Sequence, residues 1–187
     1  QAQARLEDLL ARTRKMLGEE DLETAVTYQK LARNLEAQGE YLKAQPLFEK
    51  ALALLRNLLG EMHPKTADAC SGLAGNLFLQ GKYADARLLF EKMLALQVKL
   101  QGEDHADTAA AYNNLAWTFR EQGKSAEAQP LLEKALAIDL KRHGEDHPGV
   151  ARAYLNLAAN LQRLRKYEEA QPLIEKGLAL RQKHLGE

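Results

Sequence analysis

Apolar residues recur along the chain at the spacing of an amphipathic helix. In one representative run, the steps between successive apolar residues are three, one, three, three and one: Phe48, Ala51, Leu52, Leu55, Leu58 and Leu59. That spacing places the apolar side chains on one face of a helix. The alternating runs and the Asn-Gly or Asp-Gly turns typical of β-hairpins are missing from the sequence. The pattern therefore predicts an all-α fold.

The helical pattern repeats with a period of 42 residues. One motif starts at Gly39, Gly81 and Gly123 and, with arginine in place of glycine, at Arg165. An alanine follows at the same place in every copy: Ala44, Ala86, Ala128 and Ala170. A second motif, Gly-Glu-x-His, starts at Gly60, Gly102 and Gly144. A fixed period of this length indicates a solenoid, in which one supersecondary unit is stacked repeatedly.

Each repeat is predicted to be an antiparallel pair of helices, A and B. Helix A is expected over 22–38, 64–80, 106–122 and 148–164, and helix B over 41–59, 83–101, 125–143 and 167–185. The glycine between them can adopt the left-handed backbone conformation that ends a helix. Arg165 occupies this position in the last repeat, where we expect strain or a different turn.

The period describes residues 1–187 as a single array. Residues 1–18 form a half repeat with helix B alone, and four repeats follow at 19–60, 61–102, 103–144 and 145–187. Because both ends fall inside the pattern, we expect the chain to be part of a longer repeat protein. Apolar residues near the ends then predict end-to-end association: Leu6, Leu9, Leu10, Leu17, Ile174, Leu178 and Leu185.

Charge and composition narrow the classes of partner. The 26 Lys and Arg residues balance 26 Asp and Glu residues, so the basic footprint of nucleic-acid or anionic-lipid binding is missing. We therefore expect neither nucleic acid nor a membrane as partner. No apolar stretch approaches a membrane span, and no signal peptide is visible. The single cysteine, Cys70, cannot form an internal disulfide, which fits a cytoplasmic location.

Side chains with catalytic or metal-binding chemistry do not converge. His63, His105 and His147 recur once per repeat, so they lie a full repeat apart and cannot share one metal ion. We interpret them as turn residues that fix the connection between repeats. Cys70 is expected to be a small buried thiol, and no serine lies in a nucleophile motif. The sequence predicts neither an enzyme nor a cofactor or metal site.

The third repeat carries the pattern of a known family. Its aromatic, Leu-Ala, glycine and alanine positions are occupied by Tyr112, Leu115, Ala116, Phe119, Gly123, Ala128 and Ala135. This pattern resembles the tetratricopeptide repeat, and the 42-residue length with its Gly-Glu-Asp-His-Pro connection is similar to the repeats of kinesin light chains. The resemblance implies a right-handed α-solenoid, a superhelix of antiparallel helix pairs whose A helices line a concave groove.

The resemblance also implies which residues face that groove. They are Gln29, Lys30, Arg33 and Glu36, then Ser71, Gly72, Gly75 and Phe78, then Asn113, Asn114, Trp117 and Arg120, and finally Leu155, Asn156, Ala159 and Gln162, with Arg152 and Arg163 on the flanks. Gly72 and Gly75 are expected to leave room for an inserted side chain. Our peptide-binding candidates are Lys30, Arg33, Phe78, Asn113, Asn114, Trp117, Arg120, Arg152, Asn156 and Arg163.

The candidates suit an extended, acidic ligand. Asparagine amides both donate and accept hydrogen bonds and can hold a peptide backbone, whereas arginines bind carboxylates bidentately. Trp117, the only tryptophan, is the best apolar anchor. Alternatively, Asn114 and Asn156 only bond to neighbouring helices, and Trp117 packs in the core.

The expected function is a protein–protein interaction scaffold that binds a peptide or partner segment in the groove. Two alternatives stay open at this point. One is a regulatory sensor module that gates an attached catalytic or signalling domain. The other is a self-assembly module that associates through its uncapped ends.

Overall fold

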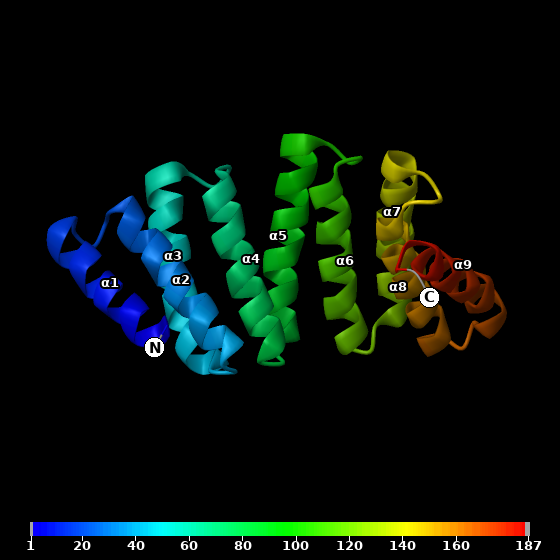
Figure 1. Ribbon diagram of the computed structural model, residues 1–187, viewed down its shortest axis with the longest axis horizontal. Helices are drawn as coiled ribbons and strands as arrows, with labels where there is room; N and C mark the ends of the chain where they lie inside the picture. The colour runs from blue at the N-terminus through cyan, green and yellow to red at the C-terminus, as the bar shows by residue number, and fades with distance from the viewer. Residues whose placement is uncertain (1, 186–187) are drawn as a thin grey trace. The chain divides into compact units, whose positions relative to one another are not determined.

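The computed structural model of the chain describes residues 2–185, with side chains through residue 184. This range contains nine α-helices and no β-strand (Figure 1): α1 Ala2–Met16, α2 Leu22–Ala37, α3 Tyr41–Leu59, α4 Pro64–Leu79, α5 Tyr83–Gln101, α6 Ala106–Glu121, α7 Ser125–His143, α8 Pro148–Arg163 and α9 Tyr167–Leu185. The all-α prediction is confirmed. The bounds predicted for helix B match, and each helix A ends one residue earlier than predicted.

The helices belong to two compact units, Gln1–Leu89 and Phe90–Glu187, and α5 spans the boundary between them. In the first unit, α2 packs against α1 and α3, and α3 packs against α4. In the second unit, α7 packs against α6 and α8, and α8 packs against α9. Within each unit, helices adjacent in sequence are therefore adjacent in space, as in a stacked helix-pair repeat. The repeat boundaries themselves stay a prediction.

Each unit has a core of small and large apolar side chains. Ala44 and Ala86 in the first unit and Ala128 and Ala170 in the second are at most 1% exposed, which fits the close helix approach predicted from their repetition. Larger side chains fill the space around them, and the fully buried ones include Phe48, Leu55, Leu132 and Val150. Burial of each such side chain stabilises the fold by about 1.5–3 kcal/mol.

Histidines cap three of the A helices. The Nδ1 atoms of His63, His105 and His147 accept hydrogen bonds from the backbone N–H two residues later, at 3.1, 3.2 and 3.0 Å. Each bond satisfies an N–H group that the start of a helix leaves without an intrahelical partner. Pro64 and Pro148 follow at the first helical position, where a missing N–H is not needed. The predicted turn role of the histidines is confirmed, and capping is its physical basis.

Threonines hold the loops that precede the A helices, a role that sequence reasoning missed. The buried hydroxyls of Thr24 and Thr108 donate to the carbonyl oxygens of Gly18 and Gly102, each at 2.8 Å. Thr66, one period after Thr24, donates instead to a carbonyl oxygen of α3, at 3.2 Å. The recurrence of threonine every 42 residues was the signal for this role.

The turns between helix A and helix B share one geometry. Gly39, Gly81 and Gly123 have φ angles of 78°, 76° and 75°, and Arg165 has 60°. The N–H of Arg165 donates to the Gln162 carbonyl oxygen at 3.0 Å, and Gly123 donates equivalently to Arg120 at 3.0 Å. The last turn therefore keeps the glycine geometry with a residue that has a Cβ atom, which confirms the expected strain and excludes the alternative of a different turn.

Gly72 on α4 packs against Phe48 on α3. A Cβ atom at position 72 would lie 2.6 Å from the Cε1 atom of Phe48, closer than packed side chains approach. The phenyl ring occupies the space that we expected an inserted partner side chain to use, so the prediction for Gly72 is wrong. A Cβ atom at Gly75 would meet no atom within 4 Å, so this glycine does leave open space.

Alanine substitutions at the two glycines of α4 should have opposite effects. Gly72→Ala should lower the free energy of unfolding by about 1–3 kcal/mol, because the added methyl group overpacks the contact with Phe48. Gly75→Ala should raise it by up to about 1 kcal/mol, because alanine is the better helix former. Urea denaturation of both variants measures the difference. Equal effects of the two substitutions would contradict the packing of Phe48 on Gly72.

Arg165→Gly should raise the free energy of unfolding by about 1 kcal/mol, because glycine adopts a positive φ without a clash of its Cβ atom. The reverse change at the matched turn, Gly123→Arg, should lower it by a similar amount. Thermal denaturation of both variants beside the parent tests the pair. A destabilised Arg165→Gly variant would show that the arginine side chain contributes more than its backbone strain costs.

Candidate functional site

All ten candidate binding residues lie on A helices, and we call the part of each unit's surface that carries them its A-helix face. None of the ten side chains is buried. The first unit contributes Lys30 and Arg33 from α2 and Phe78 from α4, and the second contributes Asn113, Asn114, Trp117 and Arg120 from α6 and Arg152, Asn156 and Arg163 from α8.

Hydrogen bonds join α2 to α4 across the A-helix face of the first unit. The Asp68 carboxylate accepts from the Gln29 amide at 2.7 Å and from the Arg33 guanidinium at 2.6 Å. Asn76 donates to the Glu36 carboxylate at 3.2 Å. The charge of Arg33, which we predicted to serve a ligand, is therefore offset within the protein. Lys30 is exposed and forms no ion pair with the described residues.

Phe78 is half-buried near the end of α4. Its ring meets the ring of Tyr83 edge to face, with centroids 5.2 Å apart and an interplanar angle of 63°. This is a favoured arrangement of aromatic rings, because the positive edge of one meets the negative face of the other. Phe78 thus offers only part of its ring to a ligand.

Asparagines join α6 to α8 in the second unit. The Asn156 amide donates to the Asn113 side-chain oxygen at 3.2 Å, and Asn113 donates to the Ala109 carbonyl oxygen at 3.0 Å. Asn156 therefore bonds to a neighbouring helix, which is the alternative role we considered for it. Asn114 is half-buried and forms no hydrogen bond through its side chain with the described residues. Its amide is available to a ligand.

Trp117 lies at the surface of α6 rather than in the core, with 46% of the residue exposed. It follows Asn113 by four residues and Asn114 by three, so the three side chains share one side of the helix. An exposed indole beside an unused amide combines an apolar contact area with a polar group. That combination is typical of binding anchors.

Two arginines lie together where α6 and α8 end. Arg163 donates to the Arg120 carbonyl oxygen at 3.0 Å and to the Glu121 carboxylate at 3.3 Å. The pKa of the half-buried Arg120 guanidinium is lowered, first by burial and then by the positive charge of Arg163. The Nε atom of Arg120 is buried and has no hydrogen-bond partner. The geometry therefore leaves positive charge that protein groups do not fully balance.

Arg152 lies on the flank of α8, exposed and outside the asparagine and arginine contacts. Burial raises the pKa of Asp139 on α7, and the positive charge of Arg152 acts in the opposite direction. The electrostatic partner of Arg152 is therefore on a helix B, which separates it from the other candidates.

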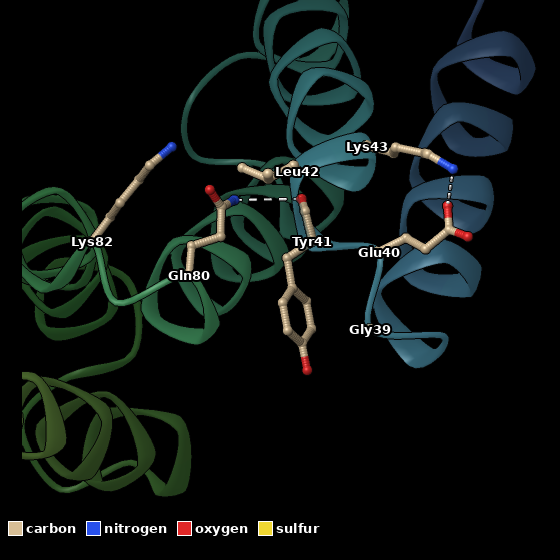
Figure 2. Close-up of a pocket in the computed structure, with 7 residues that line it drawn as sticks. All are labelled: Gly39, Glu40, Tyr41, Leu42, Lys43, Gln80 and Lys82. Carbon is tan, nitrogen blue, oxygen red and sulfur yellow. Dashed lines mark hydrogen bonds and ion pairs between the residues drawn. The ribbon is translucent and has the colours of Figure 1, made fainter.

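A surface hollow of about 580 Å³ lies beside the two A–B turns of the first unit (Figure 2), and none of the ten candidates lines it. It is lined by Gly39, Glu40, Tyr41, Leu42, Lys43, Gln80 and Lys82. Figure 2 shows Gln80 bonded to the Tyr41 carbonyl oxygen and Lys43 to Glu40, at 3.4 and 2.7 Å. Leu42 is 75% exposed in this hollow. Sequence reasoning did not single out this position.

Other chemistry is sparse in the described part of the chain. Cys70 is a buried thiol on α4 that forms no disulfide, as predicted. Residues 2–184 contain no group of three or more His, Cys, Asp or Glu side chains placed to hold a metal ion. None of the helices over the same residues is both long and apolar enough to cross a membrane.

Solved structures with the same fold include several repeat proteins. The nearly identical TPR-like repeats of a candidate kinesin light chain from Podosopora anserina are 28% identical to this chain, with a TM-score of 0.86 over 97% of this chain and 86% of that one. BtubC (BKLC) from P. vanneervenii is 24% identical, with a TM-score of 0.84 over 97% and 72%. A Rap protein complexed with Competence and Sporulation Factor is 19% identical, with a TM-score of 0.70 over 86% and 43%. No curated protein sequence matches.

The family model described as tetratricopeptide repeat matches the chain in four overlapping stretches, residues 1–57, 31–97, 65–141 and 122–183. These stretches together cover nearly the whole sequence. They agree with the helix pairs, the glycine turns and the small residues of the repeated cores. The chain belongs to the tetratricopeptide repeat family, and its repeats are of the kinesin light chain type.

Proposed function

We propose that the chain is a protein-interaction scaffold that binds an extended, acidic segment of a partner on its A-helix face. The proposal depends above all on the two arginines at the ends of α6 and α8. Arg120 and Arg163 carry two positive charges, and Glu121 forms an ion pair with Arg163. A partner carboxylate would supply further negative charge beside this pair, because guanidinium groups bind carboxylates strongly.

The side chains next to Arg120 suit the rest of such a segment. Trp117 lies about one turn earlier on α6 and offers an exposed indole to an apolar side chain. Asn114 lies a further turn away with an amide that can donate to and accept from a peptide backbone. The three residues are spaced by three along one helix, so an extended segment that follows α6 meets each in turn.

We assign the acidic contact to the second unit. In the first unit Arg33 is already paired with Asp68, and a ligand carboxylate would have to compete with that ion pair. The exposed ammonium group of Lys30 is strongly hydrated and is a weaker source of geometric specificity than a guanidinium.

Similar proteins support a binding role for this fold. The related Rap structure contains Competence and Sporulation Factor in complex with the protein. That likeness concerns the fold alone, so the chemistry of the ligand proposed for this chain comes from its own arginines, asparagines and tryptophan.

Arg120→Ala should weaken the binding of a true ligand by about 1–3 kcal/mol, because a charge-assisted hydrogen bond is lost, and Asn114→Ala by about 1 kcal/mol. Ligands can be obtained by selecting peptides from a random display library on the 187-residue chain. Selected peptides should be enriched in Asp and Glu. Because Trp117 is the only tryptophan, its fluorescence reports binding directly, and its emission should shift to shorter wavelength as the indole is covered.

Arg181→Ala is the matched control, because Arg181 is an exposed arginine on a helix B of the same unit. Its removal changes the net charge equally but should leave affinity unchanged. If Arg120→Ala and Asn114→Ala bind like the parent while Arg181→Ala does not bind, the A-helix face is not the binding surface.

Exposed leucines on α1 and α9 favour a second candidate function, self-association. Leu9 is 38% exposed, Leu17, just after α1, is 53% exposed, and Leu178 is 48% exposed. Burial of one such side chain in a contact between molecules contributes up to about 1.5–3 kcal/mol. We propose a weak association of copies through these residues.

The structure also narrows the set of end residues that we expected to be available for this association. Leu10 is buried within the first unit, so the expectation is wrong for this residue, whereas Ile174 is half-buried against the core of the second unit. Leu6 is half-buried. The side chain of Leu185 lies outside the described residues.

Light scattering should show an average mass that rises with protein concentration for the parent chain. Leu178→Glu should shift this rise to higher concentration, because a charge replaces the apolar contact. Leu42→Glu is the control, since Leu42 is exposed but lies on α3. A constant monomer mass at high concentration would contradict self-association.

A further inference from the structure

A tyrosine of helix A and a lysine of helix B face each other in three of the helix pairs. The Nζ atoms of Lys50, Lys134 and Lys176 lie over the rings of Tyr28, Tyr112 and Tyr154, at 4.9, 5.3 and 5.6 Å from the ring centroids. Each tyrosine is buried, and each lysine is exposed. The same polar pair therefore recurs with the period of the repeat.

In the first unit an internal carboxylate completes this pair. Glu19, in the loop before α2, accepts a hydrogen bond from the Tyr28 hydroxyl at 2.6 Å and forms an ion pair with Lys50. Arg14 bonds to its second oxygen at 2.6 Å. The hydrogen bond from Lys50, followed by that from Tyr28, lowers the pKa of Glu19 to about 2. A tyrosine hydroxyl and a lysine ammonium in this geometry thus bind a carboxylate.

In the second unit, the pair formed by Tyr112 and Lys134 has no such carboxylate. Glu103 occupies the sequence position of Glu19, but it is exposed and forms no ion pair or hydrogen bond with residues 2–184. The Lys134 Nζ atom donates to the Tyr112 hydroxyl oxygen at 3.5 Å, and it forms no ion pair with the carboxylates of residues 2–184. The two groups that bind a carboxylate in the first repeat therefore bond to each other, and to no described carboxylate, in the third.

A surface hollow of about 210 Å³ opens at this pair. It is lined by Glu103, Asp104, Tyr112, Lys134, Ala137, Ile138 and Lys141. Lys141 is paired with Asp104 at 2.5 Å, and Arg142 donates to the Asp104 backbone carbonyl oxygen at 3.2 Å, so these bonds hold the wall of the hollow in place. Lys134 is the cation of the hollow whose charge is available.

We propose that this hollow binds the carboxylate of a glutamate or aspartate side chain from a partner protein, between the Tyr112 hydroxyl and the Lys134 ammonium group. The bound carboxylate takes the position that Glu19 takes in the first unit. The small volume admits one side chain, and Ala137 and Ile138 offer an apolar wall to its methylene groups. None of these residues is among the ten candidates of the A-helix face, so this site and the proposed function can be tested independently.

Glu103 is the internal competitor for this site. It lies in the lining of the hollow and carries the same charge as the ligand. Its removal should therefore tighten binding, both by relieving repulsion and by removing an alternative partner for Lys134. If the ligand were attracted only by the overall charge of the surface, removal of Glu103 would have the same effect as removal of any other exposed glutamate.

The test uses glutamate blocked at both backbone ends as the probe, titrated into the full chain at neutral pH and constant ionic strength. The NMR signals of the Lys134 side chain and the Tyr112 ring should shift and saturate. Blocked glutamine, which has the same shape without the charge, should not produce these shifts. Lys134→Gln should weaken binding about tenfold or abolish it, whereas the control Lys124→Gln should leave it unchanged.

Further variants test the comparison between Glu103 in the second unit and Glu19 in the first. Glu103→Gln should tighten binding of the blocked glutamate severalfold, and Glu133→Gln, an equal charge change on the exposed side of α7, should not. Glu19→Gln should free the first-unit pair and produce new shifts at Tyr28 and Lys50. The proposal is overturned if blocked glutamate and blocked glutamine shift Lys134 equally, or if Lys134→Gln and Lys124→Gln bind alike.

Discussion

The packing of each helix on its neighbours along the chain is the constraint from which the other features of this protein follow. Every helix has one apolar stripe, and a single helix pair cannot cover it alone. Ala44 and Ala128 keep the helices of a pair close, and large side chains such as Phe48 and Leu132 fill the remaining space. The part of each helix surface that this packing leaves exposed carries mostly polar residues.

The connections between helices turn that packing into a regular repeat. Histidine caps, buried threonine hydroxyls and left-handed residues each bond to backbone groups within a few residues of the helix ends. Such bonds satisfy groups that the helix ends leave unpaired and so set where each helix starts and stops. The A-helix side chains are thereby presented at fixed intervals, which is what a binding surface for an extended segment requires.

Equivalent residues have different roles in different repeats. Glu19 is bound by Tyr28 and Lys50, whereas Glu103 makes no such contacts near Tyr112 and Lys134. The arginines of the A helices also differ in their partners, since Arg33 is paired with Asp68 and Arg163 with Glu121. The backbone pattern tolerates these differences because the groups lie at the surface, where one ion pair contributes at most about 1 kcal/mol. Functional differences between repeats can therefore arise without loss of the fold.

The sequence by itself determined the all-α fold, the repeat, and the helix bounds to within one residue. These depend on local signals: the apolar spacing, the prolines after His63 and His147, and the glycine turns with Arg165 as their variant. Only the tertiary structure decided which polar side chains are paired within the protein and which are available to a ligand. Arg33 and Asp68 are 35 residues apart, and their ion pair depends on the separation of two helices.

The same reason explains the error at Gly72 and the missed hollow at Lys134. A glycine in a helix shows that a side chain is absent, but only packing shows that Phe48 fills the space. A recurring glutamate shows where a carboxylate can be, but side-chain geometry decides whether it reaches the lysine. Local patterns set the backbone because they act within a few residues, whereas site chemistry depends on contacts between helices that are distant in sequence.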